Sequence, residues 1–329
     1  MDLSVIIPVY NEEESLPDLH SALRQALSDP ALKWEVIYIN DGSQDGSIQV
    51  LERLAEEDPE HSRVVDFRRN FGQTAAIAAG IDYSQGEIIV LMDADLQNDP
   101  QDIPMMIEKI HQGYDVVSGW RANRQDAFFS RTLPSRIANW LISTVTGVHL
   151  HDYGCTLKAY RREVITGFRL YGEMHRFIPA YASSVGARMI EVKVRHHARK
   201  YGKTKYGINR TIKVILDLFT VKFLLSYANK PIYLFGGAGI LLMLISSIAM
   251  LLLAVRRLVF NIPVLSSPIF QVSTMVFILG FQSILMGLIA EMQVRTYHES
   301  QQKPTYSVRR LIGLDTQEKH PAGMLEGRR

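Results

Sequence analysis

The chain has 329 residues, more than one domain usually needs, so we expect a soluble domain with an appended segment. Its formal net charge of +2 is too balanced to indicate a nucleic-acid binder, and we predict no nucleic-acid partner. The single cysteine, Cys155, excludes an internal disulfide framework and suits a reducing compartment.

Short β-branched runs alternate with helix-like stretches through the first third of the chain. Continuous apolar strands separated by helices predict an α/β fold with a doubly wound, mostly parallel sheet covered on both faces. Strands are expected at residues 3–9, 34–40, 63–67, 87–92 and 114–118, and helices at 12–27, 46–57, 74–83 and 103–112. Further along, residues 128–148 read as helical, and residues 156–160 and 189–196 read as strands.

A polar motif follows each of the first four predicted strands. These motifs are Tyr10-Asn11-Glu12, Asp41-Gly42-Ser43, Arg69-Asn70-Phe71-Gly72 and Asp93-Ala94-Asp95. Ligands of open α/β sheets bind at the carboxyl ends of the strands. The four motifs therefore predict one site at that edge.

The segment Asp93-Ala94-Asp95 carries the strongest chemical signal. Two carboxylates at a strand end can share a hard cation such as Mg²⁺ or Mn²⁺ together with substrate phosphates. Such an ion would offset the charge that grows on a diphosphate leaving group. The alternative is a pair of solvated turn carboxylates.

Asp41 is the second acidic candidate, because it also ends a predicted strand. Its carboxylate could accept a hydrogen bond from a nucleobase N–H. The alternative is a turn or helix-cap role within Asp41-Gly42-Ser43.

The four ordered motifs resemble those of the family 2 glycosyltransferases of GT-A fold, over about residues 1–206. Residues 121–126 and 152–162, with the apolar hairpin described below, resemble the polyprenyl-phosphate glycosyltransferases. This is the dolichol-phosphate mannose synthase-like branch, here most like undecaprenyl-phosphate aminoarabinose and glucosyl transferases. The resemblance implies a nucleotide pocket and a metal site. The pocket would contain Pro8, Tyr10, Glu12, Asp41, Asp93 and Ala94, and the Mg²⁺ or Mn²⁺ ligands would be Asp93, Asp95 and Gln97.

The same resemblance implies inverting transfer of one sugar from a nucleotide sugar, UDP-linked rather than GDP-linked, to polyprenyl (undecaprenyl) phosphate. Polysaccharide synthases of the superfamily carry Gln-x-x-Arg-Trp, which this chain lacks. That absence argues against a glycan-extending synthase. A non-catalytic membrane protein that binds a nucleotide sugar or lipid phosphate is the other alternative.

A lipid monophosphate acceptor is largely dianionic and already nucleophilic, so its site needs cations more than a base. The candidates for acceptor phosphate are Arg121, Arg124, Arg131, Lys203 and Lys205. They could instead be surface arginines and headgroup-binding lysines. Asp152 could be a base, could orient an arginine or the sugar, or could be a turn residue. We expect Asp93, Asp95, Asp152, Arg121 and Arg124 to act in catalysis.

The C-terminal third predicts membrane attachment. Residues 231–255 and 268–290 carry no charge and are long enough to span a bilayer as a hairpin, within residues 230–291. Residues 207–229 read as an amphipathic helix in the membrane interface, or as an ordinary surface helix. Cations flank the hairpin on the domain side, which predicts a multi-pass inner or plasma membrane protein with residues 1–206 in the cytoplasm.

No signal peptide is visible ahead of the first predicted strand, in agreement with that orientation. Residues 292–329 are expected to form a cytoplasmic tail without fixed structure after residue 313. The resemblance also leaves room for a homo-oligomer assembled through the membrane region.

Overall fold

The computed structural model describes residues 1–122, 139, 142–144, 146–166, 170, 174–198, 200, 232–260, 263–264, 267–300 and 306–314. It forms two compact units: a sheet unit (Met1–Val221 with Gln302–Arg329) and a hairpin unit (Lys222–Gln301). The amphipathic helix predicted at residues 207–229 lies outside the described residues, as does most of the predicted helix at 128–148.

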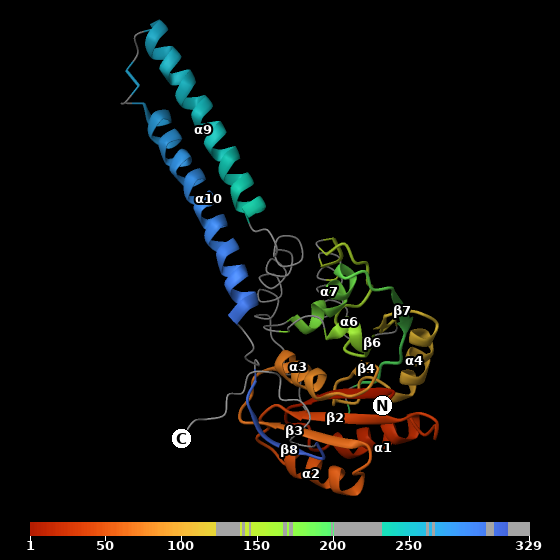
Figure 1. Ribbon diagram of the computed structural model, residues 1–329. Coiled ribbons are helices and arrows are strands. Elements are labelled where there is room, and N and C mark those ends of the chain that lie inside the picture. The colour runs from red at the N-terminus through yellow and green to blue at the C-terminus, as the bar shows by residue number, and fades with distance from the viewer. Residues whose placement is uncertain are drawn as a thin grey trace, which may run out of the picture. The chain divides into compact units, whose positions relative to one another are not determined.

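The described part of the sheet unit is built on an eight-stranded sheet in the order β7-β5-β6-β4-β1-β2-β3-β8 (Figure 1). Parallel pairs join β1 to β2 and β4, β2 to β3, and β5 to β7, whereas β6 and β8 run antiparallel to their neighbours. The predicted mostly parallel sheet is thereby confirmed. The strands are β1 (Leu3–Val9), β2 (Trp34–Asn40), β3 (Ser62–Phe67), β4 (Ile88–Leu91), β5 (Val116–Trp120), β6 (Lys158–Arg161), β7 (Met189–Lys193) and β8 (Val308–Ile312).

Helices cover both faces of the sheet. Figure 1 shows α1 and α2 on one side of β2 and β3, with α3 on the other. In α1, apolar side chains at helical spacing (Leu16, Leu19 and Leu23) are fully buried against the core. In α3, a Cβ atom at Gly80 would collide with Ile6 of β1, so glycine allows the helix to lie close to the sheet. The helices are α1 (Leu16–Ala26), α2 (Ser47–Glu57), α3 (Gln73–Tyr83), η1 (Pro100–Asp102), α4 (Ile103–His111), α6 (Arg162–Ile165), η3 (Met174–Phe177) and α7 (Ile178–Ser184).

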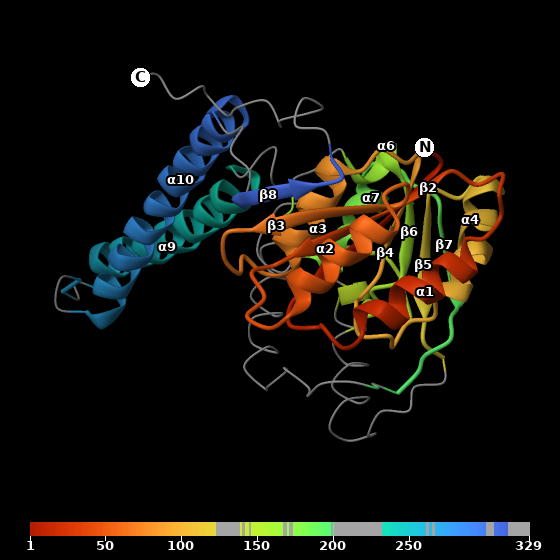
Figure 2. The same ribbon diagram turned by 90° about the horizontal axis from the view of Figure 1, so that it is seen from below.

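Strand β8 comes from the segment expected to be a tail, and it pairs with β3 as the last strand of the sheet (Figure 2). Tyr306 stacks on Phe67 of β3 with the ring centroids 5.2 Å apart, and its hydroxyl donates to Asp82 Oδ2 at 2.8 Å. Arg310 pairs with the buried Asp66, Nε to Oδ2 at 3.4 Å. These contacts, rather than an apolar run, explain why the chain returns to the sheet after the hairpin.

Replacement of Tyr306 by phenylalanine tests the attachment of β8. The change keeps the stacked ring and removes the hydrogen bond to Asp82, which is worth about 1 kcal/mol. We expect the melting temperature of the sheet unit to fall by a few degrees, measured by differential scanning fluorimetry. Tyr114→Phe, at a ring that lies under Arg188, is the control and should melt like the wild type. An unchanged melting temperature in Tyr306→Phe would contradict the assigned contact.

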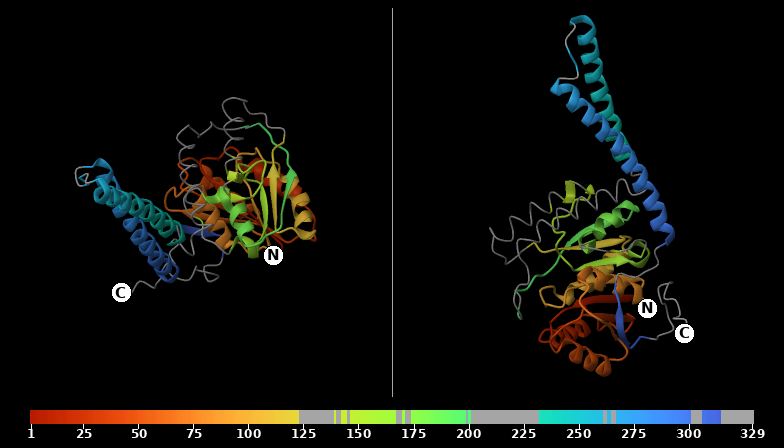
Figure 3. Two further views of the ribbon diagram at one scale, coloured as in Figure 1. Left: turned by 90° about the horizontal axis from the view of Figure 1, so that it is seen from above. Right: turned by 90° about the vertical axis from the view of Figure 1, so that its left-hand side faces the viewer.

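The hairpin unit consists of α9 (Ile232–Phe260) and α10 (Pro268–Ser300), which run side by side (Figure 3). Their segments Phe235–Val259 and Pro268–Ala290 have mean hydropathies of 2.6 and 2.0 and are long and apolar enough to cross a membrane. The helices approach closely where a Cβ at Gly239 would lie 2.5 Å from the Gly280 carbonyl oxygen. α10 continues to Ser300, beyond the predicted end of the second span at residue 290.

Candidate active site

A cavity of about 420 Å³ opens at the carboxyl ends of β1, β2 and β4. All residues predicted for the nucleotide and metal sites line it: Pro8, Tyr10, Glu12, Asp41, Asp93, Ala94, Asp95 and Gln97. Arg121 lines it as well, and Asp152 is buried behind Arg121. The other acceptor-phosphate candidates, Arg124, Arg131, Lys203 and Lys205, lie outside the described residues.

The loops after β1 and β2 are joined by hydrogen bonds. Asn11 has a left-handed backbone (φ 54°), which asparagine tolerates better than most residues. Its N–H donates to Ser43 Oγ at 3.0 Å, and its side-chain oxygen accepts from the N–H of Gln44 at 2.8 Å. The Glu12 N–H donates to Ser47 Oγ at 2.9 Å. The first two motifs therefore form one continuous wall.

Asp41 joins the second motif to the third. Its two carboxylate oxygens accept from the N–H groups of Phe71 (2.6 Å) and Gly72 (3.0 Å), where α3 begins. Burial raises the pKa of Asp41, and these two hydrogen bonds oppose the rise. The carboxylate caps a neighbouring loop rather than its own turn. Because carboxylate oxygens accept more than one donor, contact with a nucleobase stays a prediction.

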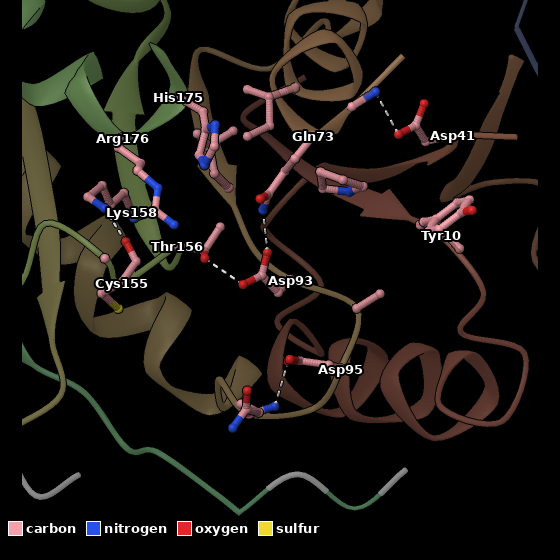
Figure 4. A pocket seen from close by; sticks show the side chains of 18 of the residues that line it. Tyr10, Asp41, Gln73, Asp93, Asp95, Cys155, Thr156, Lys158, His175 and Arg176 are labelled. Carbon is pink, nitrogen blue, oxygen red and sulfur yellow. Dashed lines mark hydrogen bonds between the residues drawn. The ribbon is translucent and has the colours of Figure 1, made fainter. Parts of the chain in front are cut away.

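Asp93 occupies the centre of the cavity wall (Figure 4). Its oxygens accept from Gln73 Nε2 at 2.8 Å and from Thr156 Oγ1 at 2.5 Å. Burial and the neighbouring charge of Asp95 raise the pKa of Asp93 to about 6, against opposing effects of Thr156 and Arg121, among others. The protein alone therefore leaves the negative charge of this site poorly compensated.

The turn after Asp93 is strained. Leu96 has a positive φ of 59°, which is uncommon for a bulky residue and is typical of functional turns. Within the turn, Asp95 Oδ1 accepts from the N–H of Gln97 at 3.1 Å. The Gln97 carbonyl accepts from the N–H of His197 at 2.9 Å, and His197 Nε2 lies 3.2 Å from Asp99 Oδ2. The segment after β7 thus holds the carboxylate turn in place.

Arg121, directly after β5, forms a two-point contact with Asp152. Arg121 Nε donates to Asp152 Oδ2 at 2.7 Å, and Arg121 Nη2 donates to Oδ1 at 3.0 Å. Asp152 is only 2% exposed. Of the roles considered for Asp152, this geometry supports the orientation of an arginine.

The cavity also contains side chains that sequence reasoning missed. Gln73 opens α3, Thr156 and Lys158 precede and begin β6, and His175 and Arg176 lie in η3. Lys158 is buried, and its Nζ donates to the carbonyls of Tyr153 and Cys155. His175 Nδ1 lies 2.7 Å from Thr74 Oγ1. The only sequence signal is the polar residues between apolar positions near residues 156–158, and it points to Thr156 and Lys158 alone.

The donor atoms around Asp93 suit a hard divalent cation. Among the described residues, no group of three or more His, Cys, Asp or Glu side chains could hold a metal ion. Asp93 and Asp95 do provide two carboxylates, with the Gln97 amide nearby in the same turn. Mg²⁺ and Mn²⁺ are commonly held by one or two carboxylates together with substrate phosphates and water. The residues therefore fit a cation completed by substrate, not an all-protein metal site.

The doubly wound sheet with a carboxylate pair at its carboxyl edge defines a GT-A-type transferase. A model of the family described as "Glycosyl transferase family 2" matches residues 4–168. The chain belongs to this family, which confirms the assignment made from the four motifs.

Two relatives extend the likeness over nearly the whole chain. The dodecaprenyl-phosphate galacturonate synthase of Rhizobium johnstonii is 40% identical over 320 residues, covering 96% of this chain and 95% of the relative. The undecaprenyl-phosphate 4-deoxy-4-formamido-L-arabinose transferase of Photorhabdus laumondii is 36% identical over 312 residues, covering 94% of each. The expected likeness to polyprenyl-phosphate sugar transferases is confirmed.

A solved structure supports the fold. Glucosyl-3-phosphoglycerate synthase from Mycobacterium tuberculosis, crystallised with Mn²⁺ and UDP-glucose, superposes with a TM-score of 0.51. The match covers 67% of this chain and 78% of that one, at 16% identity. At that identity the likeness shows the fold alone.

Proposed function

We propose that this chain transfers a single sugar from a nucleotide-diphosphate sugar to a polyprenyl phosphate, giving a polyprenyl-monophosphate sugar. One observation carries the proposal. The cavity joins the loops after β1 and β2 to the Asp93–Asp95 turn, in a chain similar over 94–96% of its length to polyprenyl-phosphate transferases.

The donor is expected to bind with its nucleoside against Pro8, Tyr10, Glu12 and Asp41, and its diphosphate toward Asp93, Ala94 and Asp95. UDP is the preferred nucleotide over GDP, and the distant structural neighbour was crystallised with UDP-glucose and Mn²⁺. Asp93, Asp95 and Gln97 would hold Mg²⁺ or Mn²⁺ together with phosphate oxygens. The ion would supply positive charge against the departing diphosphate.

The acceptor phosphate is itself the nucleophile. One of its oxygens attacks the anomeric carbon as the bond from that carbon to the diphosphate oxygen breaks, with inversion. Arg121, held by Asp152, is expected to orient the phosphate, with Arg124, Arg131, Lys203 and Lys205 adding positive charge. Asp152 is assigned to orientation, because both its oxygens already accept from Arg121 and a dianionic phosphate does not need a base.

Attachment to the membrane would bring the lipid to the site. α9 and α10 would cross the inner or plasma membrane, with the helix of residues 207–229 in the interface. The chain on both sides of the hairpin belongs to the sheet unit, which supports a location of both flanks on one side of the membrane. The cations that flank the hairpin favour the cytoplasmic side. A homo-oligomer assembled through the hairpin is compatible with this arrangement.

Purified full-length chain incubated with undecaprenyl phosphate and labelled UDP- and GDP-sugars tests the proposal. We expect one sugar per lipid, loss of product with EDTA, and recovery on adding Mg²⁺ or Mn²⁺. Sugar chains on one lipid would favour a glycan-extending synthase. No lipid product with any donor, despite nucleotide-sugar binding, would favour a non-catalytic binding protein. Full activity in EDTA would contradict the metal dependence.

A further inference from the structure

The cavity has a second charged region that the donor assignments do not use. In Figure 4, Tyr10 and Asp41 lie at one side of the cavity, and Lys158 and Arg176 lie at the other, with Asp93 and Thr156 between them. The Thr156 hydroxyl donates to Asp93 Oδ2, and Lys158 comes two residues after Thr156. The segment that contacts Asp93 therefore also carries Lys158.

Lys158 is held rigidly in this region. It is 3% exposed, and its Nζ donates to the backbone carbonyls of Tyr153, at 3.2 Å, and Cys155. Those two bonds use neutral acceptors, so neither neutralises the ammonium. A buried cation is costly unless an anion accompanies it.

Lys158 lies among charged groups of both signs. Burial lowers the pKa of Lys158. Cys155 and Asp152 oppose this shift, and the nearby charges of Arg121 and Arg176 add to it. Asp152 makes its two-point contact with Arg121. Asp93 also interacts with Lys158, but it is the carboxylate assigned to the cation. Because Asp152 is held by Arg121, an anion bound beside Lys158 and Arg176 would stabilise their positive charges.

We propose that Lys158 and Arg176 form an oxyanion subsite that binds an anion other than the donor diphosphate. An arginine fork beside a lysine point charge suits a carboxylate or a phosphate monoester. The inference rests on the proposed function, which assigns the diphosphate to Asp93 and Asp95. The anion beyond Asp93 is then either a carboxylate on the transferred sugar or the acceptor phosphate.

Equilibrium binding to the full-length chain distinguishes the two sources. The probes are UDP, the matched pairs UDP-glucose/UDP-glucuronate and UDP-galactose/UDP-galacturonate, and water-soluble geranyl phosphate. Lys158→Met and Arg176→Gln remove charge at similar side-chain length. If the subsite holds a sugar carboxylate, both substitutions should weaken the binding of only the acidic member of each pair, by roughly 10- to 100-fold. If the subsite holds the acceptor phosphate, the binding of geranyl phosphate should weaken by that factor instead.

Matched controls separate the subsite from general charge loss. Lys33→Met and Arg53→Gln change exposed residues outside the cavity and should leave all probes unaffected. Arg176→Lys keeps the charge and should retain most of the affinity that Arg176→Gln loses. Changes below twofold for every probe in both variants would overturn the subsite. Equally weakened binding of UDP itself would also overturn the subsite, because the substitutions would then have disrupted the cavity as a whole.

These binding measurements do not depend on turnover. If the wild-type chain yields no lipid product, the proposed function fails while the binding arms still report on Lys158 and Arg176. If product forms and the variants bind every probe normally, the subsite fails and the proposed function stands.

Discussion

Asp93→Asn should remove nearly all transferase activity and at the same time raise the melting temperature of the chain at neutral pH. The loss of activity follows from removing one of two carboxylates that would hold the cation against the departing diphosphate. Such charge stabilisation is worth several kcal/mol, so we expect a roughly 10³-fold lower rate.

The gain in stability follows from the raised pKa of Asp93. Burial and then Asp95 raise this pKa from an ordinary value near 3.8 to about 6. Folding therefore favours the protonated form, and the associated stability is present below pH 4 and is lost as the pH rises through 6. Asparagine removes that cost, by roughly 1–3 kcal/mol in the absence of a bound cation. Gln73 can still donate to the remaining oxygen, and the Thr156 hydroxyl can accept from the new amide.

Thermal melts at two pH values and a pH–rate profile check this prediction. The stabilisation by Asp93→Asn should be largest at pH 7.5 and about half as large at pH 5, because it vanishes only below the unfolded-state pKa near 3.8. Wild-type activity should rise as the pH increases through about 6. Glu56→Gln, at an exposed position of α2, should change neither property. A variant that melts below the wild type at pH 7.5, or that keeps its activity, would contradict the assignment.

The central strands could be predicted closely because continuous apolar runs in the sequence mark the buried positions. β1 and β2 begin and end where the continuous apolar runs do, and β2 is buried along its whole length. β8 could not be predicted in the same way. It contains two arginines in five residues, and it is stabilised by pairing with β3 and by Tyr306, contacts between residues far apart in sequence.

The residues of the candidate site also fall into a group that the sequence predicts and a group that depends on tertiary packing. Asp41 and Asp93 follow buried strands, so their meeting at one edge could be predicted. Lys158 enters the cavity because β6 lies antiparallel between β4 and β5, and Arg176 enters from the short η3. Strand order and the path of a short helix depend on tertiary packing. The role of Asp152 was open for a related reason, since a base and an ion-pair partner differ only in what lies beside the carboxylate.

Asp152→Asn is the second change with a large expected effect. It leaves Arg121 beside a neutral amide, and breaking a buried ion pair by removing one partner costs about 3–5 kcal/mol. Arg121→Gln should cost a similar amount, because it leaves the 2%-exposed Asp152 without the two-point contact. The double variant should lose less than the sum, since neither charge is then left behind. Asp115→Asn, in the more exposed pair with Arg161, is the control and should cost less than about 1 kcal/mol.

Kinetics of the same variants separate orientation from base catalysis. If Asp152 orients Arg121, Asp152→Asn and Arg121→Gln should both raise KM for the lipid phosphate. The activity rise should persist in each, because it belongs to Asp93, and loss of the Arg121 charge should move it to higher pH. If Asp152 were a base, Asp152→Asn alone would lower kcat and change the pH profile, and Arg121→Gln would not reproduce it. Because Arg121 holds both carboxylate oxygens, we expect the first pattern: the two residues act as one unit whose target is the acceptor.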